Sequence, residues 1–205
     1  MNSTRPDDAR PASGALVIAC GALAREIGAA LRLSGLDHVT LTCLPALLHN
    51  RPERIAEAVR GAVRENRGRY RTIAVAYADC GTGGALDAVC REEGVERIPG
   101  PHCYAFFSGT EAFLARGDAD MDAFFLTDFL ARQFDTLVVE GLGLDRHPEL
   151  RDLYFGNYRR LVYLAQTDDA GLAAKAAAAA ERLGLAFEMR RTGLGDLPAF
   201  LARLA

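Results

Sequence analysis

Three cysteines, each followed by a predicted helix, are the residues of this chain best suited to carry chemistry. Cys20 and Cys80 each follow a run of apolar residues and precede glycine, and Cys103 follows the turn Pro-Gly-Pro-His. A thiolate binds soft metal ions or attacks electrophiles, and a helix N-terminus behind it lowers the pKa of the thiol. Because the carboxyl ends of parallel strands share one edge of a sheet, we expect the three thiols to meet there. The pattern predicts a metal site formed by Cys20, Cys80 and Cys103.

The donor set favours zinc as the cofactor. Zinc accepts three thiolates and an exchangeable fourth ligand, and it then activates a thiol or a water for group transfer. A [4Fe-4S] cluster held by the same three cysteines is the alternative. Alternatively, each cysteine is simply a small buried apolar residue. This interpretation explains less well why the three cysteines share positions at turns with Gly or Pro. Cys43, late in a predicted strand, is a candidate fourth ligand, and Cys90, inside a predicted helix, is assigned to the core.

Two histidines and an aspartate near these cysteines are candidate catalytic residues. His102 precedes Cys103, and because adjacent residues rarely ligate one ion, we expect it to transfer a proton or to orient a ligand. His49 lies at another strand-to-helix connection, and lining or capping the helix start is an equal alternative for it. Asp79 could orient a ligand or act as a base, and the equal alternative is an aspartate that forms a turn.

The glycines after Cys80 have the composition of a phosphate-binding loop. Gly81, Gly83 and Gly84 are candidate cofactor-binding residues, because their backbone N–H groups could bind an anion. The sequence has neither a Walker lysine nor the spacing of a dinucleotide-binding motif, so a nucleotide is a poor candidate for this loop.

Length and composition argue against several classes of protein. Of the 205 residues, 50% are hydrophobic and 25% are charged, and the formal net charge is -3. This balance indicates a folded chain with no basic surface for nucleic acid. The sequence shows no apolar run long enough to span a bilayer and no signal peptide, so we expect a cytoplasmic protein without a membrane partner. Its five cysteines, an odd number, are expected to be reduced.

Predicted strands and helices alternate along most of the chain. The strands are predicted over residues 15–19, 38–44, 71–78, 95–98, 160–165 and 186–190, and the helices over residues 22–33, 51–66, 85–93, 103–116, 118–134, 147–154, 168–183 and 196–204; residues 136–144 fit either. This alternation predicts an α/β fold with a mostly parallel sheet and helices on both faces. We expect a single domain over residues 14–205 and a flexible N-terminal arm over residues 1–13.

Four motifs around the cysteines and His49 are similar to those of a known family. They are Ile18-Ala-Cys20-Gly, Leu47-Leu48-His49-Asn-Arg-Pro52, Tyr77-Ala-Asp-Cys80-Gly-Thr-Gly-Gly and Gly100-Pro-His102-Cys103-Tyr104. In these motifs, and over about residues 15–187, the chain resembles the domain-of-unknown-function family 1638, whose members occur in methanogenic archaea and in bacteria. The resemblance implies a link to corrinoid and one-carbon methyl-transfer systems, without an established activity.

These observations favour a metal-dependent cytoplasmic enzyme that acts on a small-molecule substrate. The three-cysteine centre would transfer a methyl or another group, and the resemblance suggests one-carbon metabolism. One alternative is a non-catalytic accessory protein that handles a metal or a corrinoid for a methyltransferase partner. A second alternative is a metal-free enzyme with a cysteine nucleophile, in which Cys80 pairs with His102 or His49. The sequence does not determine the substrate, the identity of the metal or whether the chain forms a homo-oligomer.

Overall fold

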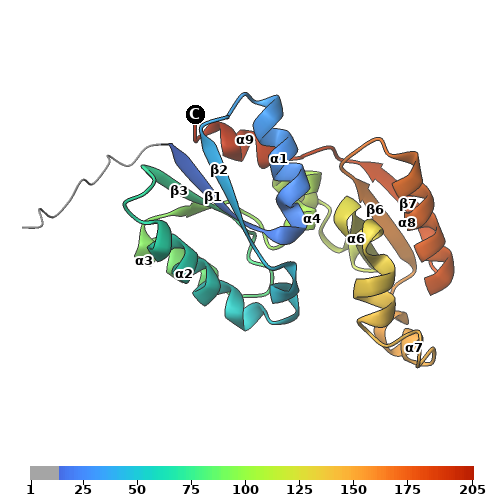
Figure 1. Cartoon of the computed structure of the whole chain (residues 1–205). Helices are drawn as coiled ribbons and strands as arrows, with labels where there is room; N and C mark the ends of the chain where they lie inside the picture. Colours follow the sequence, from blue (N-terminus) through green and yellow to red (C-terminus); the bar gives the residue numbers. More distant parts are fainter. Residues whose placement is uncertain (1–13) are drawn as a thin grey trace, which may run out of the picture.

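The chain folds into two parallel β-sheets surrounded by helices (Figure 1). The computed structural model describes residues 14–205, so the prediction for residues 1–13 lies outside the described residues. The predicted α/β class with parallel strands and helices around them is confirmed, and the strands are divided between two sheets. Within residues 14–205, every helix is too short or too polar to cross a membrane.

The first sheet has the strand order β2-β1-β3-β4, and all neighbouring strands in it are parallel. β1 (Ala15–Cys20) lies between β2 (Val39–Leu44) and β3 (Thr72–Ala76), and all six of its residues are buried. This burial on both faces explains why β1 contains only small and apolar side chains. The short strand β4 (Glu96–Arg97) forms the edge beside β3. The carboxyl ends of β1, β2 and β3 therefore lie along one edge of the sheet.

Helices cover both faces of the first sheet. The elements packed around it are η1 (Gly21–Leu23), α1 (Ala24–Leu33), η2 (Ala46–Asn50), η3 (Pro52–Arg54), α2 (Ile55–Asn66), α3 (Ala85–Glu93), α4 (Cys103–Ser108) and the C-terminal α9 (Leu197–Ala202). Figure 1 shows α2 and α3 on one face, with α1 and α9 on the other. The apolar side chains of these helices and of the strands form one continuous core.

The second sheet has the order β5-β6-β7 and is also parallel. Its strands are β5 (Ala123–Thr127), β6 (Arg160–Ala165) and β7 (Ala186–Arg191). The elements around it are α5 (Thr110–Ala115), η4 (Gly117–Asp120), α6 (Asp128–Arg132), the π-helix η5 (Asp135–Glu140), α7 (Leu150–Phe155) and α8 (Ala170–Leu183). A separate apolar cluster between this sheet, α6 and α8 forms its core.

One helix prediction is wrong and another covers two separate helices. The helix predicted over residues 118–134 is a short 3-10 turn followed by β5 and α6. The apolar run Ala-Phe-Phe-Leu-Thr fits a buried parallel strand as well as a helix, because periodicity does not distinguish the two in a short apolar run. The helix predicted over residues 103–116 is interrupted at Gly109, where φ is +80°.

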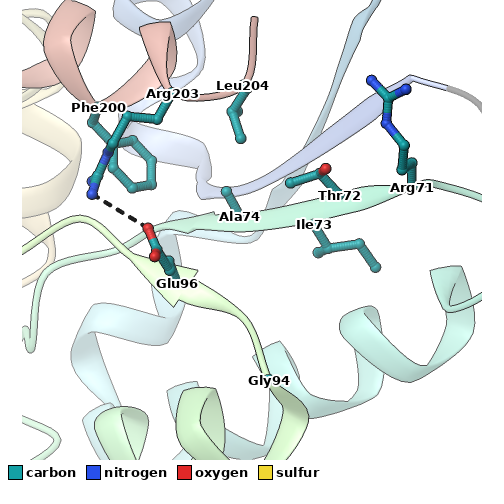
Figure 2. Close-up of a pocket in the computed structure, with 9 residues that line it drawn as sticks. All are labelled: Arg71, Thr72, Ile73, Ala74, Gly94, Glu96, Phe200, Arg203 and Leu204. Atoms are coloured by element: carbon teal, nitrogen blue, oxygen red, sulfur yellow. Dashed lines mark ion pairs between the residues drawn. The ribbon is translucent and has the colours of Figure 1, made fainter.

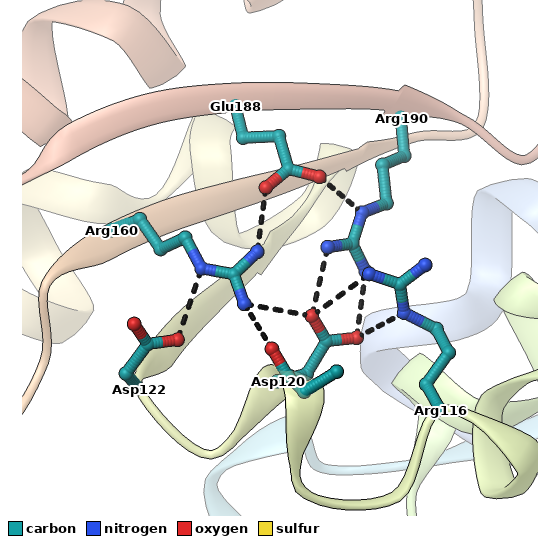
Figure 3. Close-up of polar contacts among 7 residues, drawn as sticks. Arg116, Asp120, Asp122, Arg160, Glu188 and Arg190 are labelled. Carbon is teal, nitrogen blue, oxygen red and sulfur yellow. Dashed lines mark hydrogen bonds and ion pairs between the residues drawn. The ribbon is translucent and has the colours of Figure 1, made fainter.

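A network of ion pairs lies beside the strands of the second sheet (Figure 3). Asp120 is at its centre and accepts hydrogen bonds from Arg190 at 2.8 Å, from Arg116 at 2.6 Å and from Arg160 at 3.1 Å. Glu188 joins Arg160 and Arg190 with contacts of 2.7 and 2.6 Å. The Arg190 guanidinium, assisted by Arg116, holds the pKa of the buried Asp120 carboxyl well below its ordinary value.

The chain passes from the first sheet to the second after α4, and it returns to the first sheet at α9. Asp196, just before α9, accepts a hydrogen bond from the N–H of Thr110 at 2.8 Å, and its own N–H donates to the carbonyl of Phe106 at 2.8 Å. α9 then returns to the core of the first sheet. Arg132 of α6 also approaches the buried Glu26 of α1, with 3.8 Å between nitrogen and oxygen. These contacts hold α4 and α6 between the two sheets, as Figure 1 shows.

Candidate thiol site

The three cysteines predicted to form a site line one cavity. Cys20 is the last residue of β1, Cys80 follows the end of β3, and Cys103 is the first residue of α4. Together with His49, Tyr77 and neighbouring apolar residues they enclose a cavity of about 20 Å³. A single water molecule needs about 10–15 Å³ of such space. The cavity therefore has room for one atom or one small ion.

Cys20 and His49 form a polar contact between two side chains of this cavity. Cys20 Sγ lies 3.6 Å from Nδ1 of His49 and also accepts the N–H of Ala22 at 3.4 Å. His49 belongs to η2, which follows β2, so the neighbouring strand brings it to the same edge of the sheet. The structure thus places a thiol and an imidazole from two adjacent strand-to-helix connections side by side.

Burial controls the acidity of the three thiols. It raises the pKa of Cys20 to about 11 and the pKa of Cys80 to about 12, and it raises the pKa of Cys103 further. A negative charge on Cys20 opposes ionisation of both other thiols, and one on Cys80 opposes that of Cys103. The expected lowering of these pKa values by helix N-termini is therefore wrong, because desolvation has the larger effect. All three thiols are neutral near pH 7.

The backbone at Cys80 adopts an unusual conformation. Its φ is +50°, and Cys80 is the single non-glycine residue with positive φ within residues 14–205. Its N–H donates to the carbonyl of Pro101 at 2.8 Å, and the N–H of Asp79 donates to the carbonyl of Gly100 at 3.0 Å. A left-handed non-glycine residue costs about 1–3 kcal/mol, which the surrounding structure must offset. These two bonds attach the Cys80 turn to the segment that precedes Cys103.

Tyr77 is a residue of this cavity to which the sequence analysis assigned no role. It is 0% exposed, and its hydroxyl group lies near the Cys20 thiol, although it makes no hydrogen bond of standard geometry to a described residue; burial first, and then Cys20, raise its pKa. Its ring is stacked with that of His49, with centroids 6.4 Å apart. A buried hydroxyl without a well-formed hydrogen bond costs about 1–3 kcal/mol, so this group is available to a molecule or ion bound in the cavity. The sequence feature that could have identified Tyr77 as a site residue is its position at the end of an otherwise aliphatic strand, two residues before Asp79.

Asp79 and the glycines after Cys80 interact with each other. The Asp79 carboxylate accepts hydrogen bonds from Thr82 Oγ1 at 2.6 Å, from the N–H of Gly84 at 2.9 Å and from the N–H of Gly83 at 3.2 Å. Burial raises the pKa of Asp79, but these three bonds outweigh it and hold that pKa below its ordinary value. An anion at the N–H groups of Gly83 and Gly84 would therefore have to displace this carboxylate, whereas Gly81 donates none of these bonds. The geometry matches the alternative of an aspartate that forms a turn.

His102 does not line the thiol cavity, although it is adjacent to Cys103. Its ring contacts Tyr104 and Phe113, with centroids 5.2 and 5.1 Å away. Nδ1 of His102 is buried and has no hydrogen-bond partner within the described part of the chain, and burial lowers the pKa of the ring. The side chain thus packs among aromatic rings, on a different side of the backbone from the neighbouring thiol.

The two other cysteines lie outside the cavity. Cys43 is exposed on β2, and Cys90 is buried on α3 in the core of the first sheet. Neither of them lines the thiol cavity. Three of the five cysteines therefore line the cavity, and the other two do not.

The donor atoms are suited to a metal ion, but they do not form a finished coordination site. Three thiols and one imidazole nitrogen are the ligands that zinc prefers. Within residues 14–205, however, no group of three or more His, Cys, Asp or Glu side chains is arranged so that it could hold a metal ion. A metal would require the thiol side chains to turn toward one another in the cavity that they share.

A larger hollow lies at the opposite edge of the first sheet (Figure 2). It has a volume of about 400 Å³ and is lined by the start of β3, by Glu96 of β4 and by the end of the chain around Phe200. Arg203 and Glu96 form an ion pair across it at 3.3 Å. Among residues 14–205, no cysteine or histidine lines this hollow. The groups able to carry chemistry are therefore at the carboxyl ends of the strands, where open α/β sheets bind ligands.

The fold and the site define an α/β protein with a buried cavity of three thiols at the carboxyl edge of a parallel sheet. Residues 43–201 match the family described as protein of unknown function (DUF1638), and the chain belongs to this family. The predicted family resemblance is confirmed. The matched region contains His49, Cys80 and Cys103, whereas Cys20 precedes it. A comparison with curated proteins finds no match to the chain.

Proposed function

We propose that the protein is a metal-dependent enzyme in which the thiolates of Cys20, Cys80 and Cys103 hold one zinc ion. The observation that carries this proposal is the shared cavity: three cysteines that are far apart in the sequence line it with an imidazole and with the buried hydroxyl group of Tyr77. Packing alone gives no reason for three thiols and a polar hydroxyl to surround one small space. A cation in that space would give the three thiols a common partner.

The acidity of the thiols sets a requirement for metal binding. Without a cation, burial keeps the three thiols neutral, and a first thiolate would make a second more costly. A coordinating thiol is deprotonated outright, so a bound zinc ion would convert all three to thiolates. Their protons would have to leave the site when the ion binds.

The volume of the cavity favours one ion over a cluster. About 20 Å³ accommodates a single atom, whereas four irons and four sulfides would require the cavity walls to move apart. The alternative of a [4Fe-4S] cluster therefore needs a larger rearrangement than zinc does.

The remaining residues of the cavity would act on the fourth ligand of the ion. Zinc would supply a positive charge that activates a thiol or a water molecule for group transfer. His49 is the base nearest to Cys20, at 3.6 Å, and would receive the proton of the activated group. The hydroxyl group of Tyr77 would donate a hydrogen bond to that group. The buried Phe106 and Leu23, which also line the cavity, would exclude bulk water.

The contact between Cys20 and His49 supports a second candidate function, a metal-free enzyme with a cysteine nucleophile. In that case His49 would take the proton of Cys20, so the pair is not the one of Cys80 with His102 or His49 that the sequence suggested. A nucleophilic cysteine ordinarily has a lowered pKa, whereas the pKa of Cys20 is raised to about 11. We therefore place this candidate second.

Metal analysis of protein purified without oxygen tests the proposal. We expect one equivalent of zinc in the wild type, none in the variant Cys20→Ser/Cys80→Ser/Cys103→Ser, and one equivalent in the control Cys43→Ser. Four equivalents of iron would support the cluster instead. The proposal fails if neither metal is stoichiometric and the triple variant unfolds at the same temperature as the wild type. The accessory role would be favoured if the protein binds zinc, forms a stable complex with a methyltransferase protein and shows little turnover by itself.

A further inference from the structure

A second cavity adjoins the thiol site and lies between the two sheets. It has a volume of about 210 Å³ and shares Ala22, His49 and Cys103 with the thiol cavity. A molecule bound in it would therefore contact the same thiol and the same imidazole that line the thiol cavity.

Both halves of the fold form the walls of this second cavity. The first half contributes Leu47 and Asn50 of η2, and the second half contributes Thr127 at the end of β5, Leu130 of α6 and Leu137 of η5. The cavity therefore exists only where the two sheets come together. This arrangement is typical of ligand sites, which often lie at the boundary between structural units.

The walls are mostly apolar and contain no carboxylate, ammonium or guanidinium group of the described chain. The lining residues are Ala22, Ala46, Leu47, His49, Asn50, Cys103, Tyr104, Thr127, Phe129, Leu130 and Leu137, so no Asp, Glu, Lys or Arg of the described chain lines it. Burying a charged group without a partner is costly, whereas an apolar group is favoured there. Thr127 Oγ1 already accepts the N–H of Leu130 at 3.4 Å, and the other polar side chains of the walls are those of His49, Asn50, Cys103 and Tyr104. The walls therefore favour a ligand that is uncharged and largely apolar.

The size of the cavity restricts the ligand further. Pockets for drug-sized molecules have volumes of about 300–1,000 Å³. At about 210 Å³ this cavity is smaller, and Leu47, which is 65% exposed, lies at its solvent side. A short chain or a single ring fits this space, with one end toward Cys103 and the rest between η2 and α6.

We propose that the cavity between the two sheets binds a small, uncharged, largely apolar molecule and that this molecule is the substrate of the thiol centre. The first part rests on the cavity alone, and the assignment as substrate rests on the proposed function. The reacting group of the molecule would be at its end beside Cys103 and His49.

Binding of three six-carbon probes of equal length tests the ligand class. Calorimetric titrations with 1-hexanol, hexanoate and hexylammonium are compared on the same preparation of the full chain, before and after the addition of zinc. We expect saturable binding of 1-hexanol and at least tenfold weaker binding of both charged probes. Absence of hexanol binding, or equal binding of the charged probes, would overturn the proposal.

Variants locate the binding site. Leu47→Trp places a large ring at the cavity from an exposed position, and Leu153→Trp is the matched control, because Leu153 is 73% exposed on α7. Leu130→Trp fills the cavity from the other wall. We expect at least a tenfold loss of hexanol affinity in Leu47→Trp and Leu130→Trp and no change in Leu153→Trp. Retained affinity in both cavity variants contradicts the proposal.

Zinc stoichiometry in the same variants separates this inference from the proposed function. If zinc binds and hexanol does not, the ligand cavity is wrong and the metal centre stands. If hexanol binds at this cavity and zinc does not, the cavity stands as a binding site and its assignment to a zinc enzyme is wrong.

Discussion

Zinc binding to this protein should release three protons for each ion. With a pKa of about 11, only about one Cys20 thiol in a thousand is ionised at pH 8, and the fractions for Cys80 and Cys103 are smaller still. A thiol must lose its proton to bind the metal. Each of the three ligands therefore contributes one whole proton, and an imidazole ligand contributes none, because it binds in its neutral form.

The same count sets the pH dependence of the affinity. Because three protons leave when zinc binds, the apparent association constant should rise about a thousandfold for each pH unit below the pKa values of the thiols. The sign is fixed by the raised pKa values: higher pH favours the thiolates and so tightens binding. With three ordinary exposed thiols the slope would begin to fall near their pKa of about 8.5. The steep dependence should instead continue through pH 9.

Calorimetry in buffers of different ionisation enthalpy measures the number of released protons. At pH 8 without oxygen we expect three protons per zinc for the wild type, two for Cys20→Ser and two for Cys80→Ser. The control Cys43→Ser should still release three, because Cys43 lies outside the cavity. A release of one proton or fewer in the wild type, or a lower count in Cys43→Ser, would refute the three-thiolate centre.

Three further predictions concern stability and reactivity. Asp120→Asn should lower the free energy of unfolding by about 2–3 kcal/mol, measured with urea at pH 7, because it removes the negative charge shared by Arg190 and Arg116 and replaces one of the two acceptor oxygens with an NH2 donor that faces them. Since the pKa of Asp120 is depressed, the loss should be full above about pH 4 and shrink as the pH falls below it; an equal loss in the exposed control Asp168→Asn would contradict this. Gly195→Ala should cost at least about 1 kcal/mol, because φ is +53° and a Cβ atom would collide with the carbonyl oxygen of Phe106; an unchanged melting temperature would show that reasoning to be wrong. Iodoacetamide should modify the exposed Cys43 before any cysteine of the thiol cavity in metal-free protein, as peptide mapping would show, and a faster reaction in the cavity would favour the nucleophile hypothesis.

The sequence by itself determined the fold class and the convergence of the cysteines. Apolar runs of strand length alternate with helical segments, and this local pattern requires parallel strands covered by helices. Cys20, Cys80 and Cys103 each follow such a strand, and His49 follows another. Parallel strands that start in register end at one edge, so these four side chains could be assigned to the same edge without knowledge of the tertiary contacts.

Only the tertiary structure determined the division into two sheets and the direction of each side chain at that edge. A short apolar run such as the one that forms β5 fits a helix or a strand, and the choice depends on its pairing with β6, 33 residues or more away along the chain. The direction of His102 depends on contact with Phe113, and the burial of Tyr77 depends on the separate segments that line the thiol cavity with it.

The thiol pKa values show the same limit. A local pattern places a cysteine before a helix and so predicts a lowered pKa, but burial comes from distant segments that close over Cys20, Cys80 and Cys103. Desolvation is a property of all the atoms around a group, whereas a sequence motif specifies only its neighbours along the chain. For this reason the residues of the site could be predicted from the sequence, and the neutral protonation state of the metal-free thiols could not.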